Sequence, residues 1–195
     1  MRLFTGISID DRVTQNLEQM LAPLRAAANL RWTAAENLHI TGKFIGAWPE
    51  NRLAELKTAL AAIDPPGNLE ITIAHPGFFP DGHRPRVLLA GVNSGPGLAE
   101  LAKKINDALE PLGCAREDRP YSPHVTLARI GKDQSRESVR KLGEHVASMT
   151  NFNFGSFVAE SFVLFLSQPS PGSLNTTSAG SVYTRLATWR LGSPA

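Results

Sequence analysis

Two short segments of this sequence carry side chains that could perform acid–base chemistry. Residues 39–46, HITGKFIG, nearly recur 85 positions later as residues 124–131, HVTLARIG, with His, Thr, Ile and Gly in register. Core packing would favour apolar residues at the histidine and threonine positions, because buried polar groups need hydrogen-bond partners. The repetition of both polar residues therefore predicts one functional site that contains the two segments.

The residue types in these segments suit the cleavage of a phosphodiester. Side chains alternate along a strand, so His39 shares a face with Thr41, and His124 shares a face with Thr126. An imidazole titrates near pH 6.5, so one histidine can act as a base while the other acts as an acid. The threonine hydroxyls can donate hydrogen bonds to phosphate oxygens. Together the four side chains predict in-line attack on phosphorus, with the added charge stabilised by the hydroxyl donors.

Offsets of 84 to 86 relate segments outside the two motifs, and each half reads strand, helix, histidine strand, helix, strand. This order indicates an α+β fold, a bilobal pseudo-twofold duplication in which two antiparallel sheets line a central cleft and helices lie on the outside. Residues 1–195 are predicted to form a single two-lobed domain, with repeats that start near residues 2 and 86. The matching segments are 13–24 with 98–109, Arg2 with Arg86, and 53–63 with 139–149.

Hydrophobic periodicity predicts the elements that position the motifs. The expected helices carry apolar stripes at Val13, Leu17, Met20, Leu21 and Leu24, at Leu53, Leu56, Leu60 and Ile63, at Leu98, Leu101, Ile105, Leu109 and Leu112, and at Val139, Leu142, Val146 and Met149. The expected strands are Arg2–Ile9, Leu30–Trp32, Leu38–Ile45, Leu69–Ala74, Arg86–Val92, His124–Ile130, Phe157–Leu166 and Val182–Leu191. Residues 169–180 are expected to form a surface loop.

Composition limits the class of protein. The 195 residues are 42% hydrophobic, and 20 Lys and Arg against 18 Asp and Glu permit a polyanionic partner without requiring one. The single cysteine, Cys114, excludes an internal disulfide and a multi-cysteine zinc cluster. The N-terminus lacks the apolar centre of a secretory signal, and no apolar run approaches the roughly 20 residues of a membrane span. We expect a soluble, cytoplasmic protein that has no membrane contact and no obligate protein partner.

The motifs closely resemble those of the two-histidine phosphoesterase superfamily, and within it those of the RNA 2′,3′-cyclic phosphodiesterases formerly described as 2′-5′ RNA ligases. The resemblance covers nearly the whole chain. It rests on Met1–Phe4, Arg31–Trp32, Glu36–Thr41, Phe44–Gly46, Arg86–Leu88 and Pro123–Arg129. Gly42 departs from the bulkier aliphatic residue usual in the family, a change that removes no catalytic group.

The resemblance implies a bilobal fold with a cleft and a reaction that needs neither a metal nor a cofactor. The implied reaction is hydrolysis of the 2′,3′-cyclic phosphate end of RNA or of a nucleotide to a 2′-phosphate, with reversible 2′-5′ joining in some members. His39 would protonate the O3′ leaving group, His124 would deprotonate the attacking water, and Thr41 and Thr126 would hold the phosphate. From the sequence alone the two histidines are nearly interchangeable, so the acid and base roles stay open.

Arg129 and Phe44 lie five residues after His124 and His39, respectively. Arg129 matches a basic position in the second motif of the family and could contact a phosphate oxygen. Strict alternation would instead turn it to the face opposite His124, unless a bulge or a strand end lies nearby. Phe44 has the same separation from its histidine and is expected in the core.

Phe78 and Phe79 form an apolar pair in the turn-rich segment PGFFP, followed by Arg84 and Arg86. An aromatic ring can stack on any nucleobase, at about 1–3 kcal/mol per base. The resemblance also implies a base-stacking aromatic residue near this segment, without choosing between the two rings. An equally open interpretation is that both rings seal the edge of the core.

Two other classes of function compete with the hydrolase. A non-catalytic RNA-binding module would show salt-dependent binding without cleavage. A metal-dependent phosphohydrolase would use His39 and His124 as ligands, and EDTA would inhibit it. His75 and His83 border the PGFFP segment, but they lack an acidic or cysteine partner at ligand spacing and predict no metal site. The natural RNA, its length and the oligomeric state are not indicated by the sequence.

Overall fold

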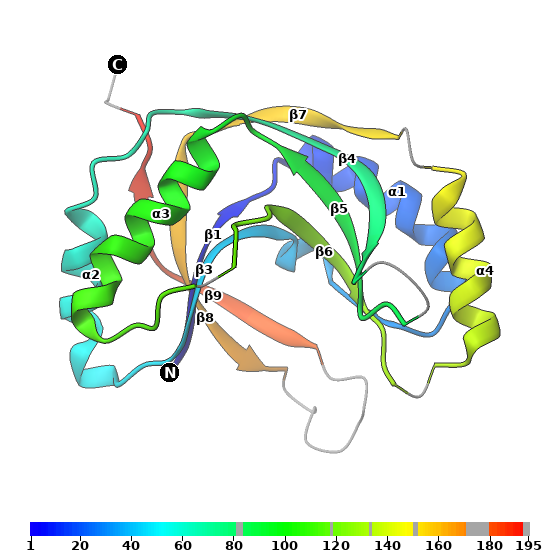
Figure 1. Ribbon diagram of the computed structural model, residues 1–195, viewed down its shortest axis with the longest axis horizontal. Coiled ribbons are helices and arrows are strands. Elements are labelled where there is room, and N and C mark those ends of the chain that lie inside the picture. Colours follow the sequence, from blue (N-terminus) through cyan, green and yellow to red (C-terminus); the bar gives the residue numbers. More distant parts are fainter. Residues whose placement is uncertain (81–83, 118, 133, 150–151, 171–179, 193–195) are drawn as a thin grey trace.

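One curled antiparallel sheet crosses the molecule, with four helices against it (Figure 1). The computed structural model describes residues 1–80, 84–117, 119–132, 134–149, 152–170 and 180–192. Its strands are β1 (Arg2–Ser8), β2 (Arg31–Trp32), β3 (His39–Ala47), β4 (Leu69–Phe79), β5 (Val87–Asn93), β6 (His124–Arg129), β7 (Asn153–Ala159), β8 (Ser161–Pro169) and β9 (Ser181–Arg190). Its helices are α1 (Asp11–Ala27), α2 (Leu53–Ala61), α3 (Gly97–Leu109) and α4 (Arg136–Ala147).

The prediction of an α+β fold is confirmed, but the prediction of two separate sheets was wrong. The nine described strands form one sheet in the order β7-β4-β5-β6-β3-β1-β8-β9, and β2 pairs with β6. Ile40 of β3 pairs with Val125 of β6 and joins the two halves. Both side chains are fully buried, so this junction is held by the core as well as by the backbone.

The apolar stripes predicted for the helices form the buried faces of these helices in the structure. In α1 the five predicted stripe residues are all buried, and the carboxylate of Asp10 caps the helix by accepting from the amides of Arg12 and Val13. α3 buries four of the five residues predicted for its stripe, and the 3₁₀ turn Glu110–Leu112 that follows it ends at Gly113, whose φ of +89° is in the left-handed region that glycine tolerates. Two of the predicted stripe residues are buried in α2 and two in α4.

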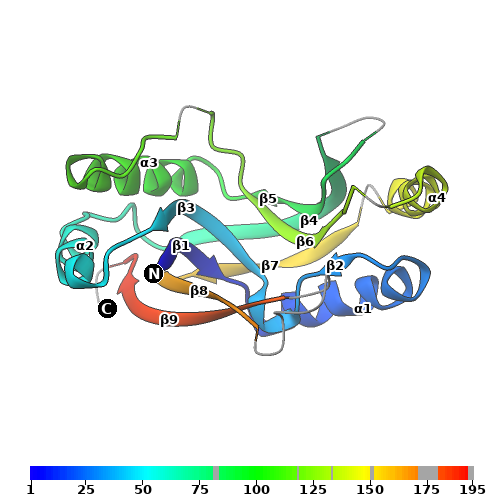
Figure 2. The same ribbon diagram turned by 90° about the horizontal axis from the view of Figure 1, so that it is seen from below.

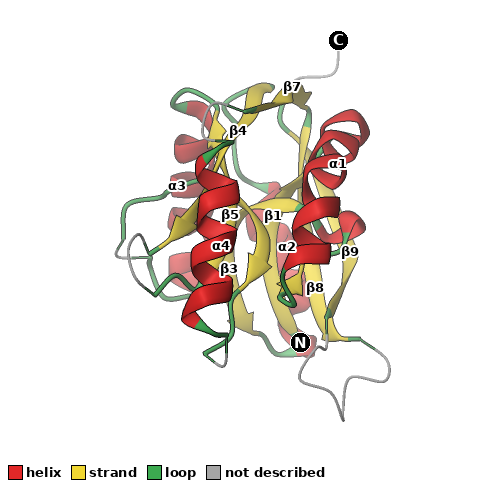
Figure 3. Ribbon diagram, turned by 90° about the vertical axis from the view of Figure 1, so that its right-hand side faces the viewer, coloured by secondary structure: helices red, strands yellow, loops and turns green. Residues whose placement is uncertain are grey.

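The helices pack in two pairs, and each pair takes one helix from each half of the chain. α2 packs against α3, and α1 packs against α4. Figures 1 and 2 show these pairs at opposite ends of the molecule, and Figure 3 shows strands between them. The middle of the sheet, where β3 meets β6, is therefore the place where the two halves of the chain face each other. No helix in the described ranges is both long and apolar enough to cross a membrane.

A β-bulge follows the histidine in each of the two central strands. In β3 the register with β1 shifts between the pairs Gly6–Thr41 and Thr5–Lys43, which leaves Gly42 as the extra residue. In β6 the register with β5 shifts between Leu89–Thr126 and Leu88–Ala128, which leaves Leu127 as the extra residue. The two bulges lie at the same position, three residues after each histidine. An extra residue reverses the alternation of the side chains that follow it.

Three predicted boundaries change in the structure. The strand expected over Phe157–Leu166 is two strands, β7 and β8, because the chain leaves the ladder at Glu160. The segment of Phe78 and Phe79 was expected to be a loop, but it is the end of β4, paired with β5. Most of the loop expected over residues 169–180 lies outside the described residues, and Pro169 belongs to β8.

Candidate active site

The residue pair that joins β3 to β6 brings the two motifs together. Neighbours of an antiparallel pair lie opposite each other, with Cβ atoms about 4.5–5.5 Å apart. The register therefore sets His39 opposite Thr126 and Thr41 opposite His124. These four half-buried side chains share the face opposite to the buried pair. The two imidazoles and two hydroxyls of the motifs thus lie on one face of the sheet, beside the pair that joins the two strands.

Both histidines are held in the same way. The Nδ1 atom of His39 lies 2.7 Å from the carbonyl oxygen of Asn37, and the Nδ1 atom of His124 lies 2.9 Å from that of Ser122. A carbonyl oxygen only accepts, so each Nδ1 carries the proton, and each Nε2 of a neutral ring is an acceptor. The hydroxyl of Thr41 donates to Nε2 of His39 over 3.1 Å. Each ring is therefore oriented through Nδ1, and Nε2 is its basic nitrogen.

His39 lies among aromatic rings. Its ring centroid is 4.8 Å from that of Phe4, 5.3 Å from that of Tyr183 and 6.1 Å from that of Phe165. Burial lowers the pKa of His39, against the opposing effect of the hydrogen bond to Asn37, and Coulombic interactions with His124 and Arg129 lower it further. The ring of His39 is therefore neutral in the unliganded protein near pH 7 and ready to receive a proton.

Arg129 faces the cleft because of the bulge in β6. Leu127 and Ala128 are both fully buried, so the extra residue returns Arg129 to the face of His124 and Thr126. The Coulombic effect of Arg129, which lowers the pKa of His39, is compatible with this orientation. The bulge that is needed to turn Arg129 to the face of His124 is thus present in β6. A guanidinium at this position can bind a phosphate oxygen.

The equivalent bulge in β3 turns Phe44 outwards, and its predicted place in the core was wrong. The Phe44 side chain is 62% exposed and lines the same cavity as His124. At the end of β4, Phe79 is 57% exposed and lines the cavity too, whereas Phe78 packs against the core. Of the two rings that the sequence left open, Phe79 is therefore the one exposed at the cleft.

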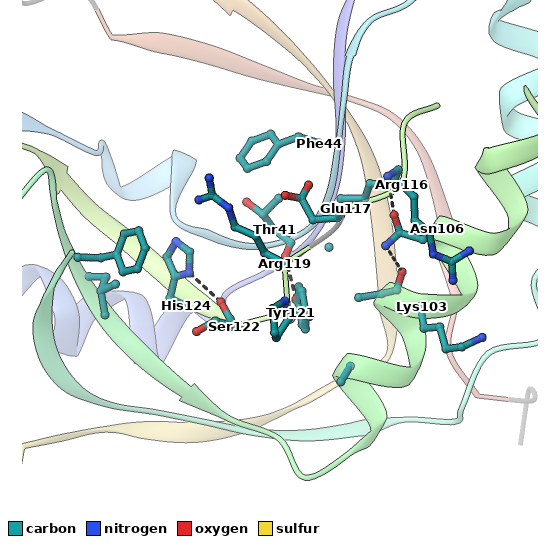
Figure 4. Close-up of a pocket in the computed structure, with 17 residues that line it drawn as sticks. Thr41, Phe44, Lys103, Asn106, Arg116, Glu117, Arg119, Tyr121, Ser122 and His124 are labelled. Atoms are coloured by element: carbon teal, nitrogen blue, oxygen red, sulfur yellow. Dashed lines mark hydrogen bonds between the residues drawn. The ribbon is translucent and has the colours of Figure 1, made fainter. Parts of the chain in front are cut away.

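A cavity of about 490 Å³ opens beside His124 and Thr41 (Figure 4). It lies between β3, α3 and the described residues of segment 116–122, and we call it the open seam. Its walls include the apolar side chains of Leu89, Ala102 and Tyr121 as well as Phe44 and Phe79. Polar and charged side chains line the rest of it, and a pocket that combines apolar walls with polar groups can take an organic ligand.

Two contacts fasten the segment before His124 to the first half of the chain. The hydroxyl of Tyr121 donates to the carbonyl oxygen of Thr41 over 2.8 Å, and burial raises the pKa of Tyr121. The buried ammonium of Lys43 donates to the carbonyl oxygen of Ala115 and to Oδ1 of Asn106, at 2.7 and 2.5 Å. These bonds cross the cleft and help to fix the separation of the two motifs.

Sequence reasoning missed Tyr121, Glu117 and Arg119, which all line the open seam. They lie in an irregular segment without periodicity, so pattern analysis had no signal there. A comparison of the halves at the offset of 85 would have drawn attention to Glu117, because its counterpart is Trp32. His75, which borders the PGFFP segment, is exposed on β4, and His83 lies outside the described residues. His145 is exposed on α4.

Arg84 and Arg86, noted beside the aromatic pair, are exposed and line a separate hollow of about 320 Å³ with Lys132 and Gln134. Neither of these two arginines lines the open seam. Among the residues that the structure describes, no three His, Cys, Asp or Glu side chains come together in a way that could hold a metal ion. The groups that the structure gathers around the two histidines are hydroxyls, a guanidinium and aromatic rings.

Known proteins share both the sequence pattern and the fold. The pattern of the 2′-5′ RNA ligase superfamily matches residues 13–158. An RNA 2′,3′-cyclic phosphodiesterase of Methanocaldococcus jannaschii is 28% identical over 97% of this chain and all of its own. TT0787 of Thermus thermophilus superposes with a TM-score of 0.78 at 26% identity, over 98% of both chains. LigT of E. coli complexed with 3′-AMP superposes with a TM-score of 0.71 at 25% identity, over 97% of both chains. The chain belongs to the 2′-5′ RNA ligase superfamily.

Proposed function

We propose that this protein hydrolyses the 2′,3′-cyclic phosphate end of RNA, or of a nucleotide, to a 2′-phosphate without a metal ion. The observation that carries the proposal is the pair of imidazoles on one face of the β3–β6 junction, each held through Nδ1 so that Nε2 is its basic nitrogen. The relatives that carry the name RNA 2′,3′-cyclic phosphodiesterase support it over nearly the full length of the chain. The whole described chain would act as one two-lobed domain with its cleft at this junction.

Water attacks phosphorus opposite the P–O3′ bond. His124 takes the proton of the water, the new P–O bond forms, and the P–O3′ bond breaks as His39 delivers a proton to O3′. The hydroxyls of Thr41 and Thr126 and the guanidinium of Arg129 hold the non-bridging oxygens, whose charge grows in the transition state. The phosphate stays on O2′. After the reaction His124 carries the extra proton and His39 has lost its own, and proton exchange with solvent restores the starting state.

The lowered pKa of His39 is compatible with its role as the acid. The cyclic phosphate is an anion, and an anion beside Nε2 favours the protonated ring. His39 would therefore gain its proton as the substrate binds. A 5′-hydroxyl of a second RNA in the place of the water would give a 2′-5′ linkage by the same proton transfers, which is the joining reaction that the name of the superfamily refers to.

The test is incubation with nucleoside 2′,3′-cyclic phosphates in the presence of EDTA, with the 2′- and 3′-phosphate products separated by chromatography. We expect turnover in EDTA and a 2′-phosphate product. A 3′-phosphate product would keep the phosphoesterase chemistry but reverse the leaving group. Activity that EDTA removes and added metal restores would favour the metal-dependent hydrolase, and binding without turnover would favour the RNA-binding module.

A further inference from the structure

The two halves of the chain differ at one place beside their central strands. Arg31 and Trp32 of β2 pair with Arg129 and Ala128, so a short strand closes that side of β6. At the offset of 85 the counterparts of β2 are Arg116 and Glu117, which lie outside any strand. In their half of the molecule the space beside β3 is the open seam. The same position is thus filled in one half and open in the other.

The residue at the centre of this difference is Glu117. Its counterpart, Trp32, packs against the core, and its indole Nε1 donates to the carbonyl oxygen of Ala28 over 3.1 Å. Glu117 instead lines the open seam, and Figure 4 shows its carboxylate directed towards the ring of Phe44. Glu117 is exposed rather than packed in the core as Trp32 is, so its carboxylate is accessible to a ligand that enters the cavity.

The ion pairs formed by other charged side chains at the open seam help to define the role of Glu117. Lys103 and Arg116 form ion pairs with Asp107, and Arg116 also pairs with Glu110. Among the described residues Glu117 takes part in none of the recorded ion pairs, and neither does Arg119, which points back towards His124 in Figure 4. Glu117 is therefore a carboxylate that accepts hydrogen bonds within a cavity whose walls suit a flat ring.

We propose that Glu117 determines the base preference of the enzyme by accepting hydrogen bonds from the nucleobase of the nucleotide that carries the cyclic phosphate. This inference rests on the proposed function, which sets the phosphate at His39 and His124 and leaves the attached nucleoside to enter the open seam. Phe44 and Phe79 contact the faces of the base, and Glu117 meets its edge.

The chemistry of a carboxylate ranks the four bases. A carboxylate only accepts, and its two oxygens match two neighbouring donors. Guanine presents N1–H and an amino group side by side. Adenine and cytosine present one amino group next to a ring nitrogen that accepts. Uracil presents one N–H between two carbonyl oxygens, which the carboxylate repels. Guanosine 2′,3′-cyclic phosphate is therefore the preferred nucleoside substrate, and the uridine compound is the poorest.

The experiment compares kcat/KM for the four nucleoside 2′,3′-cyclic phosphates. The wild-type protein should favour the guanosine over the uridine substrate by about fivefold or more. Glu117→Gln replaces one acceptor by a donor, and should bring this ratio close to one, mainly through KM. Glu110→Gln is the matched control, because Glu110 pairs with Arg116 and does not line the open seam. The control should keep the wild-type ratio.

Binding of the products gives a second measurement that does not depend on turnover. Guanosine 2′-monophosphate should bind the wild-type protein more tightly than uridine 2′-monophosphate in calorimetry, and Glu117→Gln should remove the difference. An unchanged ratio in Glu117→Gln, or no base preference in the wild type, would overturn the inference while the hydrolase assignment stood. Failure to hydrolyse any of the four compounds would instead count against the proposed function, and the calorimetry would still decide on Glu117.

Discussion

The two histidines are chemically alike but lie in unlike surroundings. Each donates its Nδ1 proton to the carbonyl oxygen two residues before it. Around His39, however, stand the rings of Phe4, Phe165 and Tyr183, whereas His124 borders the open seam. The two motifs thus supply two like groups, and burial among aromatic rings lowers the proton affinity of His39. A pair of like residues acquires different roles through its environment rather than through its sequence.

Replacement of either histidine by alanine tests whether the reaction needs both imidazoles. We expect His39→Ala and His124→Ala each to lower kcat for a nucleoside 2′,3′-cyclic phosphate by about 10²–10⁴-fold, the usual contribution of a positioned acid or base. His145→Ala, on the exposed face of α4, is the control and should retain full activity. Near-normal turnover in either single variant would show that the reaction does not use the pair.

The two bulges should respond unequally to the same replacement. Leu127 is fully buried, so Leu127→Ala should lower the free energy of unfolding by about 2–5 kcal/mol. Gly42→Ala adds a Cβ about 3.0 Å from the hydroxyl oxygen of Thr5, and this crowding should cost about 1–3 kcal/mol. Urea unfolding followed by circular dichroism measures both values. A larger loss for Gly42→Ala than for Leu127→Ala would mean that the two bulges do not pack as described.

Replacement of Arg129 distinguishes a phosphate contact from a solvated arginine. Arg129→Ala should lower kcat/KM by about tenfold or more, because a hydrogen bond to a charged group is lost. Arg129→Lys should recover only part of the rate, since an ammonium cannot bind two oxygens in the fork geometry of a guanidinium. Arg190→Ala, at the end of β9, is the control for a change of net charge. Equal rates for all three variants would show that Arg129 is a solvated side chain that does not contact the phosphate.

The smallest expected effect is on stability at low pH. Because the folded pKa of His39 lies below its ordinary value of 6.5, the unfolded chain binds the proton first. The stability that the neutral His39 contributes is present above pH 6.5 and is lost as the pH falls through the folded pKa, at about 1.4 kcal/mol per unit of difference.

Urea midpoints at pH 8 and pH 5 measure this loss, and His39→Gln should reduce the difference between them. His124→Gln is the companion variant, because its ring lacks the aromatic neighbours of His39. If both variants changed the pH dependence equally, the contrast between the two surroundings would not extend to proton binding.

The sequence predicted those features that follow from local periodicity. The buried stripe of α1 and the strands that carry His39 and His124 follow from spacing alone, because burial of one face needs no knowledge of the partner. The offset of 85 predicted the approach of the two motifs, since equivalent strands of a duplication meet at its axis. The family resemblance added the reaction and the roles of the residues.

Features that depend on long-range geometry were not predictable in this way. One sheet forms instead of two because Ile40 meets Val125, a pairing between segments far apart in the chain. Phe44 was expected in the core because alternation gives no sign of a bulge at Gly42. Glu117 lies in a segment without regular structure, where residue type and spacing carry no information about orientation.

The junction of β3 and β6 has a mechanical consequence. Ile40 and Val125 form the one recorded pair between these strands in the described ranges, whereas β8 and β9 are paired along almost their whole length. A sheet bends most easily where its ladder is shortest, so small tilts of one half against the other are concentrated at this line. The gap between the imidazoles lies directly on it. Ligand binding would therefore stiffen the molecule most at its centre, and slowed hydrogen exchange there would report an occupied cleft.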